Sequence, residues 1–328
     1  MTELLKFEVF APINGLLLDN EELIDYLQES VQELLEIGSL VFDIPETGKV
    51  SCEISLSDEY VSQSSKKPRK SQALVFKIEV PEREVEATIY YEDTETKTHS
   101  VENYVSLVAE DFKLQLTNFL LFLQIAKPGA LRTSEGDLLI NNEYYNSFDS
   151  ISSIHQETYL DIKKIGWPKF RNLKYKEAID WYKRFNLSFE KIANTKVEIA
   201  LNAFSYLFEY RSDITLDLFW SLVGIEALYC TGKEGKAEQI FEKTQVVLGP
   251  IIDFKKKVKN MYNFRSRLIH GDLFIPSAIS ESFSLKDIED YNVEFYDTTI
   301  FSVAILTATL QELIYLDKDN LSFRTILV

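Results

Sequence analysis

The chain has 328 residues, a mass of 38.0 kDa and a formal net charge of −17. This length allows two domains with separate cores, and a hydrophobic content of 45% indicates a globular rather than a disordered protein. The acidic balance argues against broad, non-specific binding to nucleic acid, which requires a basic surface.

The few cysteines and histidines bear on metals and on the compartment. Cys52 and Cys230 lie far apart without metal-ligand spacing, so we expect no metal site, no cofactor and a reducing cytoplasm. The sequence predicts no signal peptide. The most apolar segments, 118–126 and 300–310, are too short or too interrupted by polar residues to span a bilayer. We therefore expect a soluble cytoplasmic protein.

The first half of the chain mixes strand-like and helix-like patterns. These predict a strand opening residues 4–18, a helix over 20–36, strands at 39–44 and 49–55, a hairpin of 73–80 with 84–91, a helix over about 101–127 and short strands within 130–160. The polar run 62–71 predicts an exposed loop whose basic residues are either solvated or in contact with nucleic acid.

We expect residues 1–165 to form a mixed α+β domain, in which the sequence indicates no catalytic motif. A sensor, an oligomerisation platform and a scaffold all remain open for this domain, as does recognition of a protein or phage-derived trigger.

Glycine and proline at 165–168 mark the expected domain boundary. Beyond it the periodicity becomes helical, and helices are predicted at about 174–186, 195–211, 215–230, 235–248, 251–270 and 294–317. Residues 166–328 are thus expected to form an all-α bundle. The apolar helix 294–317 either joins two copies or closes the core of one.

The apolar run Leu216-Asp-Leu-Phe-Trp-Ser-Leu-Val-Gly-Ile-Glu-Ala-Leu-Tyr229 contains one carboxylate near its end, Glu226. Helical steps of three and four from Glu226 reach Leu222, Val223, Tyr229 and Cys230, so the carboxylate should lie on a buried face. A buried carboxylate needs a partner, because the loss of hydration is otherwise not offset.

A second stretch, Met261-Tyr-Asn-Phe-Arg-Ser-Arg-Leu-Ile-His-Gly-Asp272, is typical of the last turns of a helix, with Gly271 as a left-handed cap. It carries Arg265, Arg267 and His270. Imidazole moves protons near neutral pH and guanidinium holds phosphate charge, so the combination suits work on a phosphodiester. Alternatively, these residues are surface cations that complement the helix dipole.

The two stretches together, IEALY followed by YNFRSRLIHG, resemble the Apea-like branch of the HEPN family over residues of about 174–318. Arg265 and His270 fall on the Arg-x4-His motif of that family, and Ser266 is the polar residue after the arginine. The resemblance implies a HEPN-like helical bundle and a metal-independent endoribonuclease whose Arg/His pairs meet in the cleft of a homodimer. It also implies a setting in bacterial antiviral defence or growth arrest.

Transferred to this chain, the resemblance implies that His270 acts as general acid or base at the RNA 2′-hydroxyl and that Arg265 stabilises the scissile phosphate. Positions five apart on an ideal helix differ by about 140°, so Arg265 and His270 would not share a face. Arg267 is then a supporting phosphate contact. Glu226 orients either arginine or forms a structural ion pair, and Tyr262 lines the groove or belongs to the core.

Basic charge is concentrated before this motif. Residues 253–272 hold six Lys and Arg residues against two Asp residues, a local balance of 6 − 2 = +4, and Lys255, Lys256 and Lys259 are the expected RNA contacts. A solvated helix face is the other interpretation. At the level of the whole protein, the alternative to a ribonuclease is a non-catalytic module in which the bundle dimerises and the N-terminal domain recognises a partner.

Overall fold

The computed structural model describes residues 3–13, 21–63, 70–91, 94–131, 133–149, 153–185, 192–207, 214–232, 235–251, 255–273 and 286–324. The chain forms two compact units, one of Met1–Leu121 with Ala130–Ile151 and one of Phe122–Gly129 with Ser152–Val328. The first combines an antiparallel sheet with helices and the second is largely helical, so the predicted α+β class is confirmed. The division near residue 151 precedes the expected boundary at 165.

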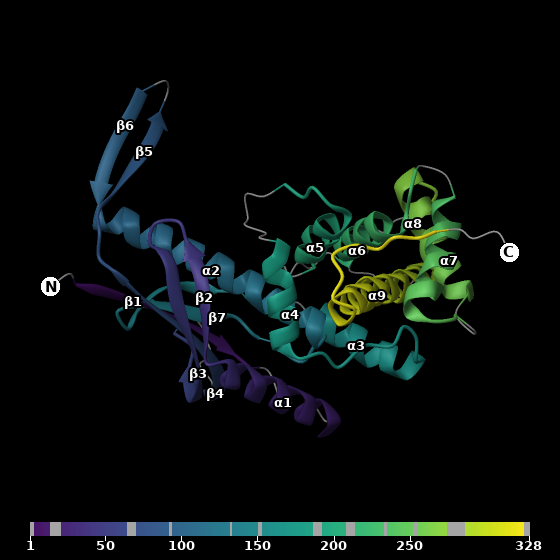
Figure 1. Ribbon diagram of the computed structural model, residues 1–328, viewed down its shortest axis with the longest axis horizontal. Helices are drawn as coiled ribbons and strands as arrows, with labels where there is room; N and C mark the ends of the chain where they lie inside the picture. The colour runs from purple at the N-terminus through teal and green to yellow at the C-terminus, as the bar shows by residue number, and fades with distance from the viewer. Residues whose placement is uncertain are drawn as a thin grey trace. The chain divides into compact units, whose positions relative to one another are not determined.

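The first unit is built on a sheet of six described strands (Figure 1). In chain order these are β1 (Leu4–Pro12), β2 (Ser39–Ile44), β3 (Gly48–Val61), β4 (Lys70–Pro81), β7 (Gly136–Ile140) and β8 (Glu143–Phe148). Their spatial order is β2-β3-β4-β1-β7-β8, and all pairs are antiparallel. β5 (Val85–Tyr91) and β6 (Thr94–Ser100) form a separate two-stranded ribbon.

Two helices accompany this sheet, α1 (Glu21–Ile37) and the first part of α2 (Val101–Ala126). The alternation of β2 buries every second residue, because successive side chains of a strand point to opposite faces. Phe42 of β2 thereby meets the rings of Phe112 and Phe119 on α2, with centroids 6.1 and 6.4 Å apart. An aromatic layer therefore joins α2 to the sheet.

The predicted hairpin of 73–80 with 84–91 is wrong. β4 pairs with β1 and β3, whereas β5 pairs with β6. Both predicted segments are strands, but alternation shows only that a segment is extended and does not identify its neighbour. β4 instead holds a central place in the sheet, with a neighbour on each side.

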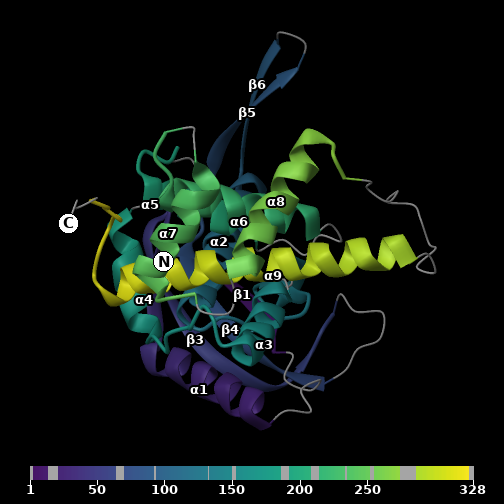
Figure 2. The ribbon, with the colours of Figure 1, turned by 90° about the vertical axis from the view of Figure 1, so that its right-hand side faces the viewer.

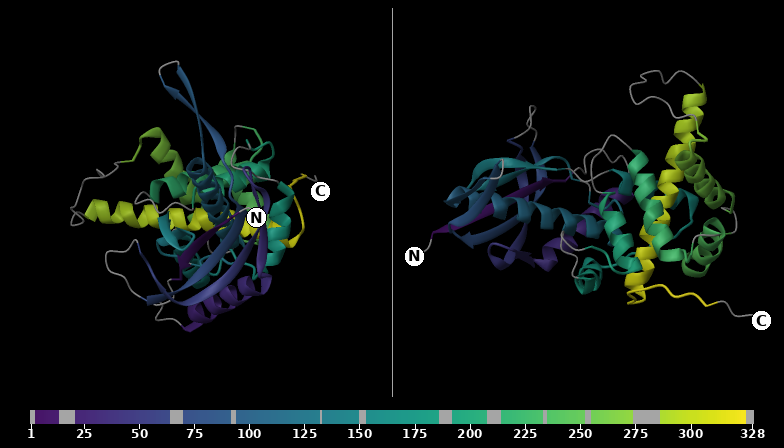
Figure 3. Two further views of the ribbon diagram at one scale, coloured as in Figure 1. Left: turned by 90° about the vertical axis from the view of Figure 1, so that its left-hand side faces the viewer. Right: turned by 90° about the horizontal axis from the view of Figure 1, so that it is seen from above.

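The second unit consists of helices that lie around α9 (Figures 2 and 3). They are α3 (Ile154–Ile165), α4 (Tyr175–Tyr182) with the 3-10 turn η1 (Lys183–Phe185), α5 (Lys196–Ser205), α6 (Ile214–Tyr229), α7 (Lys236–Leu248), α8 (Lys255–His270) and α9 (Lys286–Tyr315). All six predicted helices are present, but their ends differ: the described residues 206–207, 251 and 316–317 are not helical, and α9 begins at Lys286 rather than at 294. Residues 186, 208–211 and 252–254 lie outside the described ranges. The sequence patterns did not predict α3.

α9 is the core helix of this unit and contacts α3, α4, α6, α7 and α8. By length and composition alone it is apolar enough to cross a membrane, but most of it is buried within the unit. Ile300, Phe301 and Leu306 are at most 2% exposed. These side chains fill the core of one copy, so they are not available to join a second copy.

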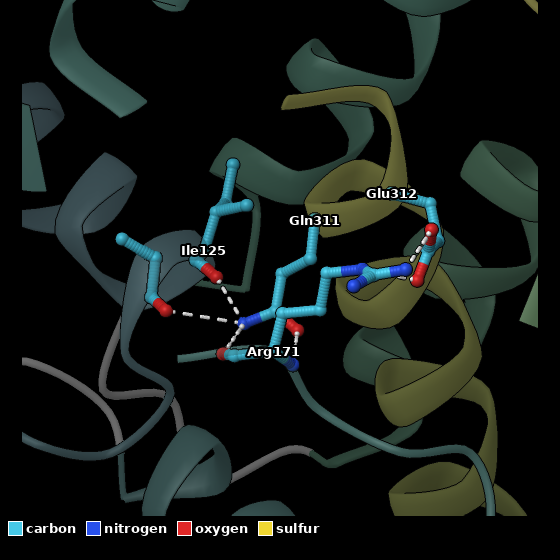
Figure 4. Close-up of polar contacts among 5 residues, drawn as sticks. Ile125, Arg171, Gln311 and Glu312 are labelled. Carbon is cyan, nitrogen blue, oxygen red and sulfur yellow. Dashed lines mark hydrogen bonds and ion pairs between the residues drawn. The ribbon is translucent and has the colours of Figure 1, made fainter. Parts of the chain in front are cut away.

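Gln311 of α9 connects three segments that are far apart in the sequence (Figure 4). Its amide Nε2 donates to the carbonyl oxygens of Ile125, Ala126 and Arg171 at 2.8, 3.1 and 3.1 Å. Its Oε1 accepts the backbone N–H of Arg171 at 2.8 Å. The side chain is fully buried. One side-chain amide therefore supplies hydrogen bonds to backbone groups at the end of α2 and in the segment before α4.

The side chain of Arg171 extends this contact to the surface of α9. Its guanidinium donates two hydrogen bonds to the carboxylate of Glu312, at 2.6 and 2.8 Å. It also lies 3.6 Å from the centre of the Tyr315 ring. The bidentate pair and the ring fix the guanidinium in one orientation.

His155 of α3 is buried in the second unit, and we expect it to make this unit sensitive to acid. Burial lowers the pKa of His155 from 6.5 to about 3, and the nearby backbone of Leu207 opposes this shift only weakly. Below pH 6.5 the unfolded chain binds a proton that the folded chain does not. Stability is thus fully present above pH 6.5 and falls by about 1.4 kcal/mol per pH unit below it, or about 2 kcal/mol at pH 5.

Urea unfolding between pH 7.5 and pH 5, followed by tryptophan fluorescence, measures this loss. All three tryptophans belong to the second unit, so their fluorescence follows the unfolding of that unit. Asp111, whose pKa is raised to about 6 by burial and by Glu46, belongs to the first unit and does not contribute to this signal. His155→Phe should remove most of the slope, because it removes the proton site. An unchanged slope in this variant would assign the acid sensitivity to other groups.

Candidate functional site

The candidate site lies where the end of α6 meets α7 and α8. α8 buries Val258, Met261 and Phe264 at helical spacing, which fixes the direction of the remaining side chains. Gly271 follows the last turn with φ of 76°, and the N–H of Asp272 donates to the carbonyl of Arg267 at 2.8 Å. These are the features of a glycine-terminated helix, so the predicted cap is confirmed.

Glu226 is the shared partner of two cations. Its Oε1 lies 3.2 Å from Nη2 of Arg265, and its Oε2 accepts a hydrogen bond of 2.5 Å from Nζ of Lys236. The side chain of Glu226 is only 13% exposed and that of Arg265 is 25% exposed. The buried carboxylate thus has the partner that its apolar surroundings require. Of the two candidate arginines, Arg265 is the one beside it.

Tyr262 completes the surroundings of Arg265. Its ring centre lies 5.8 Å from the guanidinium carbon, one turn earlier on α8. Burial, followed by the charge of Glu226, raises the pKa of Tyr262. The side chain is partly buried and is therefore a neutral phenol at neutral pH. Ring and carboxylate together restrict the orientation of Arg265.

Two further lysines meet the C-terminal end of α6. Nζ of Lys196 donates to the carbonyl of Cys230 at 2.7 Å, and Nζ of Lys243 donates to that of Tyr229 at 2.6 Å. Both cations complement the negative end of the helix dipole and satisfy carbonyls that the helix leaves free. We call Lys196, Lys236, Lys243 and Arg265 the cation cluster. Two of these cations, Lys236 and Arg265, contact Glu226, and the other two contact the backbone at the end of α6.

His270 and Arg267 occupy a different face of α8. Both are exposed, and Arg267 lies 3.6 Å from Glu294 in an exposed ion pair, a type that contributes little to stability. α8 remains helical to His270, so the angle of about 140° between Arg265 and His270 is not reduced within one chain. The structure therefore brings Arg265 to Glu226 and His270 to the face of Arg267.

The other predicted residues lie along α8. Lys255, Lys256 and Lys259 are exposed at its beginning, and Nζ of Lys255 is 5.1 Å from the ring centre of Phe241. Ser266 is partly buried next to Arg265. Among the described residues, no group of three or more His, Cys, Asp or Glu side chains is placed to hold a metal ion.

Sequence reasoning missed Lys196, Lys236 and Lys243. They come from the first turns of α5 and α7 and from the middle of α7, and only the packing of these helices brings them to α6. In comparisons with known proteins, no family model matches this chain, and no curated protein or solved structure matches it significantly.

Proposed function

We propose that the second unit is a HEPN-like, metal-independent endoribonuclease that uses Arg265 and His270. The observation that carries the proposal is the Arg265 side chain, held between Tyr262 and the carboxylate of Glu226 that it shares with Lys236. A guanidinium fixed before the substrate arrives loses little freedom on binding a phosphate. In a chain of net charge −17, a local excess of cations is the surface to which a polyanion is attracted.

The proposed reaction is transfer of the phosphodiester to the neighbouring 2′-oxygen. His270 removes the proton of the 2′-hydroxyl, and the 2′-oxygen attacks phosphorus. The bond to the 5′-oxygen breaks, and this oxygen takes up a proton from water, while His270 keeps the proton of the 2′-hydroxyl. The products are a 2′,3′-cyclic phosphate and a free 5′-hydroxyl. Arg265 stabilises the negative charge that grows on the phosphoryl oxygens.

The angle between Arg265 and His270 bears on the assembly. The two side chains project from α8 in different directions, so one chain alone does not present them to the same phosphate. We therefore propose that the active form is a homodimer in which Arg265 of one copy acts with His270 of the other. Light scattering that gives only the 38.0 kDa monomer in an active sample would contradict this arrangement.

A cleavage assay in the presence of a chelator tests the activity itself. Labelled single-stranded RNA should be cut in excess EDTA, and a phosphatase that removes simple phosphates should leave the cyclic ends intact until acid opens them. RNA in which every ribose is 2′-O-methylated is the matched control, because it lacks the attacking hydroxyl. Cutting of the methylated RNA would exclude the proposed reaction.

The two arginines of α8 provide an internal comparison. Arg265→Ala should lower kcat/KM by about 10²–10³-fold, because it removes a donor that stabilises the transition state. Arg267→Ala should lower it by less than about tenfold, since it removes only a supporting phosphate contact. The reverse order would show that Arg267, which shares the exposed face of His270, is the phosphate ligand.

The second candidate function is a non-catalytic interaction module. The specific observation in its favour is that Glu226 already neutralises part of the charge of Arg265 and Lys236. In that case the residues of the site hold the helices together, and wild type would cut no RNA with or without a trigger. In either case we propose a role in bacterial antiviral defence, with the first unit receiving a protein or phage-derived signal.

A further inference from the structure

Two exposed aromatic side chains, Tyr206 and Phe219, contact Trp220 where the end of α5 meets α6. Tyr206, directly after α5, stacks on Trp220 of α6 with ring centroids 3.8 Å apart and an interplanar angle of 7°. Phe219 meets the same indole nearly perpendicularly at 5.1 Å. Tyr206 and Phe219 are 45% and 42% exposed. We call these three residues the aromatic cluster. Large rings left in water on a helix surface indicate a binding surface.

The aromatic cluster and the cation cluster share one side of α6. Phe219 and Glu226 are seven residues apart, which places them on the same side of the helix and about 10 Å apart along its axis. Val223 lies between them and is also partly exposed. Glu226 in turn holds Arg265 and Lys236. A partly exposed stripe of α6 thus leads from aromatic rings to cations.

α5 repeats this arrangement beside α6. Its first residue, Lys196, contacts the end of α6 at Cys230, and Tyr206 at its other end contacts Trp220 near the beginning of α6. The two helices therefore run antiparallel. Cations lie at one end of the pair and aromatic rings at the other.

We propose that this face of α5 and α6 binds single-stranded RNA, with unpaired bases stacked on Tyr206 and Phe219 and phosphates held by Arg265 and Lys236. The inference rests on the proposed function, because it supplies the path by which the strand reaches Arg265. Every base has a flat face, so stacking on aromatic side chains tolerates any sequence, and it contributes roughly 5- to 150-fold in affinity per base.

The charge of the occupant and the pairing of its bases distinguish single-stranded RNA from a duplex or a second copy of this chain on this face. The bases of a duplex are already stacked on one another and are not free to cover the rings. A second copy of this chain seated on the aromatic cluster would cover the rings but would bring no phosphate to Arg265 and Lys236. A single strand offers both phosphates for the cations and open bases for the rings.

The inference is tested by comparing the affinity of the protein for two labelled strands, measured by fluorescence anisotropy. One strand is a short RNA, and the other is an abasic strand that has the same phosphates but no bases. The protein carries His270→Ala, so the RNA stays intact. Tyr206→Ala or Phe219→Ala should weaken binding of the RNA by about 5- to 150-fold. Neither should alter binding of the abasic strand, because the phosphate contacts remain.

Matched variants separate stacking from other effects. Phe219→Leu keeps an apolar side chain without an aromatic face and should weaken RNA binding as Phe219→Ala does. Tyr206→Phe keeps the ring and should bind normally. Val246→Ala is the control for exposed apolar area, since Val246 lies on α7 and is 76% exposed, and it should bind normally.

The outcomes distinguish this inference from the proposed function. If wild type cuts RNA but binds intact and abasic strands equally, stacking is overturned and the ribonuclease stands. If base-dependent binding is found without cutting, stacking stands and catalysis is overturned. If neither strand binds, both are overturned. If the aromatic variants change only the size of the assembly, the cluster joins protein copies and the RNA assignment is overturned.

Discussion

Replacing His270 with alanine is expected to reduce RNA cleavage by about 10²–10⁴-fold, the usual contribution of a positioned proton-transfer group. His270 is exposed as the last residue of α8, so its loss should leave the fold intact. RNA affinity should change little, because the cation cluster remains. The measurement is single-turnover cleavage of labelled RNA, which separates chemistry from binding.

Two controls make this result specific. His99→Ala changes another exposed histidine, in the first unit, and should cleave at the wild-type rate. Added imidazole should restore part of the activity of His270→Ala and none of that of Arg265→Ala, because it replaces a proton carrier and not a phosphate ligand. Wild-type cleavage by His270→Ala would remove this residue from the mechanism.

Gln311→Ala is expected to lower the free energy of unfolding of the second unit by about 3–5 kcal/mol. The substitution removes four hydrogen bonds and leaves the carbonyls of Ile125, Ala126 and Arg171 without this donor. A buried polar group that loses its partner costs about 1–3 kcal/mol, and the cavity adds to the loss. Against a typical total of about 5–15 kcal/mol, this is a severe change.

Denaturant unfolding followed by tryptophan fluorescence gives the size of the effect. Gln311→Leu nearly conserves the volume but not the hydrogen bonds, so it should be almost as destabilising as Gln311→Ala. Gln239→Ala is the matched control, because Gln239 makes its hydrogen bonds with Thr231 and with Nζ of Lys243 from a partly exposed side chain, and it should cost less than about 1 kcal/mol. A loss below about 1 kcal/mol in Gln311→Leu would show that other donors or water replace the amide.

The sequence predicted elements better than it predicted their neighbours. The alternation of 39–44 and the helical period of 20–36 each follow from a local pattern, and both elements are present. The pairing of β4 with β1 and β3 depends on segments elsewhere in the chain, so the hairpin prediction failed. α3 is rich in polar side chains and buries His155 and Thr158 among them, so its sequence carries no clear apolar stripe.

At the candidate site, too, the sequence identified residues better than it identified their partners. The sequence placed Glu226 on an apolar helix face and required a partner for it, and a cation is there. It did not decide between Arg265 and Arg267, because that choice depends on the rotation of α8 around its axis. The aromatic cluster was missed, although Phe219 and Trp220 are adjacent in a helix that is apolar on every side. That excess of apolar surface was the available signal.

The contacts of Gln311 have a consequence for synthesis of the chain on the ribosome. The amide joins residues that are 140 and 186 positions away from it, and α9, the helix that fills the core, comes last among the described helices. Until about residue 315 has emerged, α3, α4, α6, α7 and α8 lack the helix against which they pack. The nascent second unit therefore exposes its apolar faces late into translation, when chaperones bind such surfaces and when neighbouring nascent chains aggregate through them.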